Sequence, residues 1–367
     1  MPADPHAPAA PGATDFERFV VIDYVDELRQ LEKTYAEAAA VDVTDLAAWL
    51  RDHGDRPLVA AGAGGSLAVA QLAAQLHQRA TGRLGASREP MDLYLLGDAV
   101  DTAVLLVTAS GGHSDSLACC RLLPQVPVDA AVFCGKVDSP GEQLLAGTDV
   151  DVFAFELLPD VHGWVAVNVL LAQAVVLARA FAQAHPTLGT VPASLADLLP
   201  GGPEVTDVDA ALDHVVDVLG EALAQPLLVF LHGPDTKTAA IDLDSKFAES
   251  GLGELSMSEY RNFAHGRYQM MLPRLAEAGV VALYGVREEP YARTSLDAIP
   301  DHVPHAGLAA TGDSPAAEQV GSLVLLLLLV GAIGRVRGID VGWGSRHTFG
   351  DVLYDLDLAD LINPTAH

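Results

Sequence analysis

The chain has 367 residues, enough for about two domains, and half of them are apolar, so a sizeable core can be buried. It carries 49 acidic and 21 basic residues, which gives a formal net charge of −28. This surplus of acid argues against nucleic acid and against anionic membrane surfaces as partners, because both bind clustered Lys and Arg.

The N-terminus and the cysteines indicate in which cellular compartment the protein is expected. Residues 1–15 are rich in Ala and Pro and have neither a basic nor an apolar stretch, so we expect a disordered leader and not a signal peptide. Cys119, Cys120 and Cys134 form neither a disulfide framework nor a metal pattern, which indicates reducing conditions. We therefore expect a cytoplasmic protein without a bound metal.

In the first half, strands are expected to alternate with helices. Apolar residues at helical spacing first predict a helix over residues 16–53. The strands expected after it are 58–61, 91–96, 102–108, 130–134 and 150–154, and the helices are 67–79, 116–123 and 163–184. Such alternation predicts a parallel sheet with helices on both faces.

The same order returns in the second half. Residues 186–207 are rich in Pro, Gly and Asp and are expected to link two α/β domains, residues 16–185 and 208–367. The expected helices are 208–224, 239–251 and 316–337, and the expected strands are 227–232, 280–286 and 307–310. The apolar run 323–333 is too short to span a bilayer and is typical of a buried helix or a subunit interface.

Two turns of the first half lie where parallel sheets bind ligands, beyond the carboxyl ends of strands. Residues 62–66, Gly-Ala-Gly-Gly-Ser, bring backbone amides to a helix N-terminus, and residues 110–116 add the hydroxyls of Ser110, Ser114 and Ser116. Either turn alone is typical of an ordinary capped helix. The two together favour an anion site, although neither the dinucleotide fingerprint nor the P-loop motif is present in the sequence.

A candidate acid–base pair lies in the second half. Glu249 falls on an apolar helical pattern, and His265 follows on a loop between Arg261 and Arg267. A carboxylate in a partly dry pocket can abstract and return a proton, and an imidazole titrates near neutrality. The alternative is that the arginines offset nearby acid and His265 caps a helix. Lys237 is interpreted as a solvated loop lysine.

These segments resemble the sugar isomerase (SIS) domain. The resemblance rests on Gly62 to Ser66, on Pro90-Met-Asp, and on Thr108-Ala-Ser-Gly-Gly-x-Ser-Asp115. In the second half, Lys246-Phe-Ala-Glu-Ser and Ala264-His-Gly resemble the isomerase half of glucosamine-6-phosphate synthase at the same 16-residue separation. The resemblance extends from about Leu58 to Asp340. It implies two tandem three-layer αβα units of SIS type, each with a flavodoxin-like parallel sheet.

The resemblance also implies a function. It implies a sugar phosphate as ligand, an aldose–ketose isomerase that needs no cofactor, and a homodimer. Glu249 would move a proton between C1 and C2, and His265 would open the sugar ring. The positions that would hold the substrate are Gly64, Gly65, Ser66, Thr108, Ser110, Gly111, Ser114, Arg261 and Arg267.

The sequence departs from the family in several places. His113 replaces a threonine of the first loop, and residues 342–350 contain no counterpart of the synthase's C-terminal lysine. The glutamine-hydrolysing domain has no counterpart either. Because residues 283–290 carry no Ser-Gly loop, we expect one sugar-phosphate site per pair of units. A phosphosugar deaminase or deglycase, or a non-catalytic sugar-phosphate sensor, are the alternatives.

Overall fold

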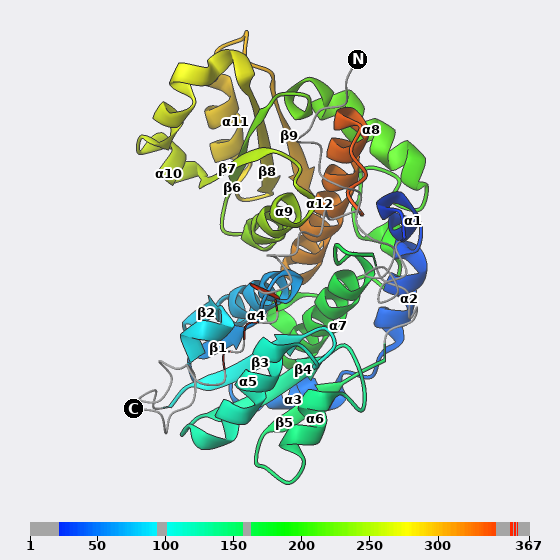
Figure 1. The fold of residues 1–367 in the computed structure, drawn as a ribbon, viewed down its shortest axis with the longest axis vertical. Coiled ribbons are helices and arrows are strands. Elements are labelled where there is room, and N and C mark those ends of the chain that lie inside the picture. The colour runs from blue at the N-terminus through cyan, green and yellow to red at the C-terminus, as the bar shows by residue number, and fades with distance from the viewer. Residues whose placement is uncertain are drawn as a thin grey trace, which may run out of the picture.

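The computed structural model describes residues 22–93, 101–156 and 163–342, together with Leu353, Tyr354, Leu356 and Leu358. Within them the chain forms two parallel sheets, one in each half, with helices between and around them (Figure 1). The predicted leader and residues 343–350, where the synthase lysine would lie, fall outside the described residues.

The first sheet has five parallel strands in the order β2-β1-β3-β4-β5. The strands are β1 (Leu58–Ala61), β2 (Gly85–Arg88), β3 (Ala103–Thr108), β4 (Asp129–Cys134) and β5 (Asp151–Ala154). Helices α4 (Gly65–Thr81) and α7 (Asn168–Ala184) cover one face, and α5 (Ser114–Leu122) and α6 (Pro140–Leu145) cover the other. This strand order is that of flavodoxin-like sheets and places the chain reversal between β1 and β3.

The second sheet repeats this arrangement with four parallel strands in the order β7-β6-β8-β9. The strands are β6 (Leu227–His232), β7 (Glu254–Glu259), β8 (Ala278–Gly285) and β9 (His305–Ala310). Helices α8 (Val208–Leu223), α9 (Lys237–Ser250) and α12 (Pro315–Arg337) cover the inner face, and α10 (Tyr260–Ala264) and α11 (Glu289–Asp297) the outer. The predicted class, three-layer α/β units with parallel sheets, is confirmed.

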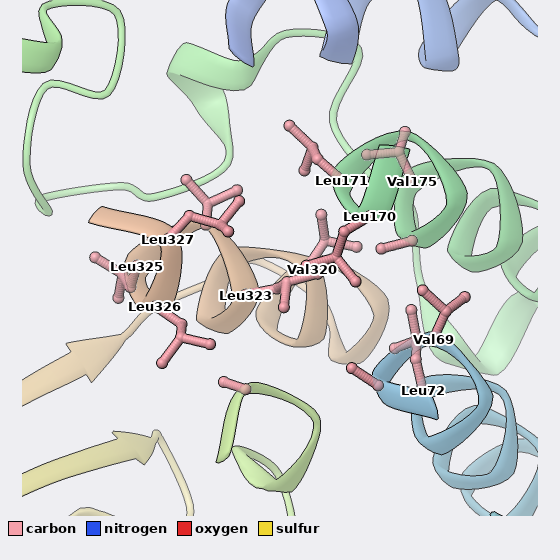
Figure 2. Packing of buried hydrophobic residues seen from close by; sticks show 14 of the residues in the cluster. Val69, Leu72, Leu170, Leu171, Val175, Val320, Leu323, Leu325, Leu326 and Leu327 are labelled. Atoms are coloured by element: carbon pink, nitrogen blue, oxygen red, sulfur yellow. The ribbon is translucent and has the colours of Figure 1, made fainter. Parts of the chain in front are cut away.

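One hydrophobic core joins the two halves. It contains the inward-facing residues of both sheets and the helices between them, whereas the outer faces have separate, smaller clusters. Figure 2 shows its centre, where Val320 and Leu323 of α12 lie beside Leu170 of α7 and beside Val69 and Leu72 of α4. The halves therefore share buried apolar surface and are held together by the hydrophobic effect.

The apolar run 323–333 lies within the last helix, which has nearly the bounds expected from the sequence. Helix α12 spans 23 residues, long and apolar enough to cross a bilayer by length and composition, and its whole apolar window is buried inside the protein. The stretch 186–207 between the two sheets is also packed, because Leu188, Leu195 and Leu198 are buried in the shared core.

Several predicted elements differ in the structure. The single helix expected over 16–53 is three helices from residue 24 on, α1 (Tyr24–Leu28), α2 (Leu31–Ala40) and α3 (Thr44–Asp52). Asp42 accepts hydrogen bonds from the backbone N–H and the hydroxyl of Thr44, which starts a new helix. Residues 90–93 form a 3-10 turn, so the described part of the strand expected over 91–96 is not a strand; residues 94–96 lie outside the described residues. A strand that was not expected, β2, lies earlier.

Candidate active site

A cavity of about 790 Å³ opens at the carboxyl ends of β1 and β3, where the order of the first sheet reverses. Such reversals leave a crevice in which α/β proteins bind ligands. Its polar lining comes from the two Gly/Ser turns, from Glu89 after β2 and from the second half of the chain, and it includes the carboxylates of Glu89 and Asp115. The hydroxyl and ionisable groups among the lining residues include Ser66, Thr108, Ser110, His113, Ser116 and Glu249.

Hydrogen bonds hold the hydroxyl groups of the turn after β3 in fixed positions. The Thr108 hydroxyl lies 2.9 Å from that of Ser116 and accepts a hydrogen bond from the backbone N–H of Gly111. Gly111 has φ +62°, and a Cβ there would lie 2.6 Å from Oγ of Ser139. Gly111 therefore shapes the turn without lining the cavity, while Ser110 faces it.

The turn after β1 offers backbone donors. Gly64 adopts φ +54° and precedes α4 without a side-chain hydrogen bond to cap the helix. The N–H groups of Ser66 and Leu67 donate to the carbonyls of Ala63 and Gly64, so the turn itself engages two of the first amides of the helix. An anion at this N-terminus would be held by the remaining amides of the first turn and by the Ser66 hydroxyl. Gly64 and Ser66 line the cavity, whereas Gly65 and Ser114 are not among its lining residues.

Glu249 reaches this cavity from α9. A Cβ on Gly64 would lie 3.6 Å from Oε1 of Glu249, so the carboxyl group sits against the turn after β1. Burial raises the pKa of Glu249, and a 2.6 Å hydrogen bond from the Ser245 hydroxyl opposes that rise. Lys246 points elsewhere, since its ammonium lies 2.7 Å from Asp242 in a fully buried ion pair.

His265 does not meet Glu249 within one chain. Helix α9 starts at the carboxyl edge of the second sheet and runs back, so Glu249, 12 residues after Lys237, lies about 18 Å away toward the opposite edge. Strand β7 then returns to the carboxyl edge, and α10 ends just before His265. His265, Arg261 and Arg267 are exposed there, and none of them lines the cavity of the first sheet.

The matching crevice of the second sheet, between β6 and β8, is filled by a side chain. The buried Glu288 carboxylate accepts hydrogen bonds from the N–H groups of Asp235 and Gly285 and from the Thr236 hydroxyl. A Cβ on Gly233 would lie 2.2 Å from its Oε1. Glu288 thus occupies the position that an anion would take, and it lies in the segment that replaces the Ser-Gly loop.

Sequence reasoning missed two parts of the site. One is Glu288, whose partners Asp235 and Thr236 lie some fifty residues earlier in the chain. The other is the C-terminal segment, since Tyr354, Leu356 and Leu358 line the first cavity and the ring of Tyr354 lies 4.6 Å from that of His113. Within the described ranges, no three His, Cys, Asp or Glu side chains converge as metal ligands would.

Comparison with known proteins shows which solved structures share this fold. No family model and no curated protein sequence matches the chain. The C-terminal domain of glucosamine-fructose-6-phosphate aminotransferase from Francisella tularensis matches with a TM-score of 0.61 at 14% identity, over 90% of this chain and 99% of that one. Tagatose-6-phosphate ketose/aldose isomerase from Escherichia coli matches with a TM-score of 0.61 at 16% identity, over 92% and 99%.

A third match is a protein from Silicibacter pomeroyi DSS-3, provisionally named a phosphosugar isomerase. It has a TM-score of 0.64 at 18% identity, over 87% of this chain and 100% of that one. This chain has the fold of these three proteins. The SIS-type fold expected from the sequence is therefore supported, and the expected tandem arrangement of two such units stays a prediction. At such identities the likeness concerns the course of the backbone and assigns neither ligand nor reaction.

Proposed function

We propose that the cavity at β1 and β3 binds a sugar phosphate. The observation that carries the proposal is the presence of Ser66, Thr108, Ser110 and the carboxyl group of Glu249 in one cavity. The serine hydroxyls and the N-terminal amides of α4 are suited to a phosphate. The Glu249 carboxyl group sits against the turn after β1 and lines the same cavity, so it would lie beside a sugar bound there. The names of the structural neighbours favour this class of ligand.

We propose that the reaction is aldose–ketose isomerisation. Glu249 would take the proton from C2 of the open-chain sugar and return it to C1, while a hydroxyl proton moves from O2 to O1. Burial raises the pKa of Glu249 toward the range in which a carboxyl group both accepts and returns protons near neutrality. No electrons leave the substrate, so side chains alone suffice.

The isomerase proposal requires a second copy of the chain. His265 lies at the far edge of the second sheet, so it reaches a cavity of this kind only in another subunit. No Lys or Arg is among the residues that line the described part of the cavity. A neighbouring loop that carries His265 between Arg261 and Arg267 would supply both the imidazole and the missing positive charge. We therefore propose a homodimer in which each cavity is completed by the other subunit.

A non-catalytic sugar-phosphate sensor is the second candidate. The position of His265 outside the cavity of its own chain favours it, because one subunit alone would bind the sugar without a group to open the ring. A deaminase or deglycase would use the same carboxyl group on an amino sugar or a glycated substrate.

The deciding experiment is NMR in D2O with glucose 6-phosphate, mannose 6-phosphate and glucosamine 6-phosphate. An isomerase incorporates deuterium at C2 and forms the ketose, and Glu249→Gln abolishes both. Thermal stabilisation by a sugar phosphate without exchange identifies the sensor. If no sugar phosphate stabilises the protein, the ligand class itself is rejected.

A further inference from the structure

A second cavity, of about 710 Å³, lies between the two halves of the chain. Helix α4 and strand β2 contribute Arg79 and Arg88, and the second half contributes Lys237 and Arg287. Asp235 is the single carboxylate among the lining residues. Four basic side chains around one acidic one are unexpected in a chain whose net charge is −28.

The charges of this cavity are not balanced internally. Asp235 binds Arg287 through two hydrogen bonds of 2.7 and 3.0 Å and lies 3.3 Å from Arg79, which also lies 3.9 Å from the buried Glu318 carboxylate. Arg79 and Arg287 are thus paired. Within the described part of the chain, Arg88 and Lys237 are exposed and have no carboxylate partner; Arg88 donates to the carbonyl of Ser87. Two cations that face a cavity without counter-charges favour a bound anion.

The remaining walls are polar and are built from both halves. Gln75 of α4 donates to the carbonyl of Pro234 and accepts from the Thr238 hydroxyl, and Gln319 of α12 donates to the carbonyl of Asp235. These bonds fix the walls in place. No aromatic ring is among the lining residues, so a nucleotide base would find nothing to stack on. Amides and hydroxyls suit the hydroxyl groups of a sugar.

We propose that this cavity is a second ligand site, which takes a phosphorylated sugar, with Arg88 and Lys237 at its phosphate. It lies apart from the proposed active site and does not depend on the reaction there. The position between the halves makes it a regulatory site.

The two cavities lie at opposite ends of one pair of antiparallel helices. At one end, Gly64, just before α4, lies against Glu249 near the end of α9. At the other end, Arg79 of α4 binds Asp235 just before α9 begins. In Figure 1 these helices lie next to each other between the sheets. A ligand that draws Arg88 of β2 toward Lys237 of α9 would shift β2, and α4 that packs on it, against α9 and so change the spacing of Ser66 and Glu249.

The test is calorimetric titration of the full chain with glucose 6-phosphate, with inorganic phosphate and AMP as comparison ligands. Arg88→Ala/Lys237→Ala removes the second site, and Ser66→Ala/Ser110→Ala removes the first. Arg121→Ala/Lys136→Ala is the matched control, because it deletes two exposed charges that line neither cavity. Melting temperatures confirm that each variant is folded.

We expect two glucose 6-phosphate sites per chain. Arg88→Ala/Lys237→Ala should weaken one of them at least tenfold and leave the other occupied, and Ser66→Ala/Ser110→Ala should do the reverse. Binding linkage further predicts that occupancy of either site changes the affinity of the other by the same factor. The proposal is overturned if the wild type has a single glucose 6-phosphate site whose affinity is unchanged in Arg88→Ala/Lys237→Ala. It is also overturned if the control variant loses as much affinity as Arg88→Ala/Lys237→Ala. Tighter binding of AMP than of glucose 6-phosphate overturns the sugar assignment.

Discussion

The Ser245 hydroxyl donates a 2.6 Å hydrogen bond to Oε1 of Glu249, one helical turn further along α9. A donor to the charged form of a carboxyl group lowers its pKa, so this bond limits the rise that burial causes. These are the two largest effects on the pKa of Glu249; the charges of Lys246 and Asp242 add smaller and opposite shifts.

Replacing Ser245 by Ala should raise the pKa of Glu249. The hydrogen bond from Ser245 favours the charged form of the carboxyl group, so its loss shifts the pKa of Glu249 upward. The measurement is NMR titration of the carboxyl carbon of Glu249. In an active enzyme, the acidic limb of the pH profile should move up with it, because Glu249 must be ionised to take a proton. Ser250→Ala is the control, since that hydroxyl binds the carbonyl of Val341. An unchanged titration in Ser245→Ala would contradict the assignment.

Mixed dimers test whether a site draws Glu249 and His265 from different subunits. Glu249→Gln and His265→Ala should each abolish C2 exchange. When the two variants are co-expressed in equal amounts, half of the dimers are mixed, and each mixed dimer has one intact site. We expect about a quarter of the wild-type activity to return, as closed two-fold symmetry requires. No recovery in isolated mixed dimers would show that the two residues do not act across subunits.

Gly64→Ala should damage ligand binding more than it damages the fold. Its backbone has φ +54°, which a side chain adopts only with strain of about 1–3 kcal/mol. Relief of this strain would move the N-terminal amides of α4 and the contact with Glu249. Gly82→Ala is the control, because Gly82 has φ +70° at the other end of α4 and a Cβ there meets open space. Gly64→Ala should lose more stability than Gly82→Ala in thermal unfolding, because ψ is −132° at Gly64 but 2° at Gly82, which is the left-handed helical conformation that a side chain tolerates better. Gly64→Ala alone should lose sugar-phosphate binding.

The sequence predicted the parts of this fold that depend on buried, continuous apolar strands. β1, β3, β4, β6 and β8 were predicted because both faces of such strands are covered and polar residues are few. Strand β7, Glu-Leu-Ser-Met-Ser-Glu, was not predicted because it is a partly exposed edge strand with alternating polar residues. Without β7, the sequence gives no means to see that the chain carries His265 away from Glu249.

The candidate site also has residues that the sequence could predict and residues that it could not. Ser66, Thr108 and Ser110 could be predicted, because a turn after a parallel strand always faces the ligand edge of the sheet. The role of Glu288 could not, because its donors at Asp235 and Gly285 come together only through the order of β6 and β8. The cluster of Arg79, Arg88, Lys237 and Arg287 was equally hidden, since it forms across the two halves.

Glu288 itself gives the last prediction. Glu288→Ala leaves the buried amides of Asp235 and Gly285 without an acceptor, which should cost about 2–5 kcal/mol of unfolding free energy. The vacated position is lined by donors and has the size of a carboxylate, so acetate or phosphate should refill it. Because a ligand that binds only the folded state raises the melting temperature with its concentration, either anion should stabilise Glu288→Ala more than the wild type. Glu289→Ala is the matched control, since that side chain is half-exposed and pairs with Arg293. It should melt close to the wild type and gain nothing further from acetate. An equal response of all three proteins to acetate would mean that Glu288 does not stand in an anion's place.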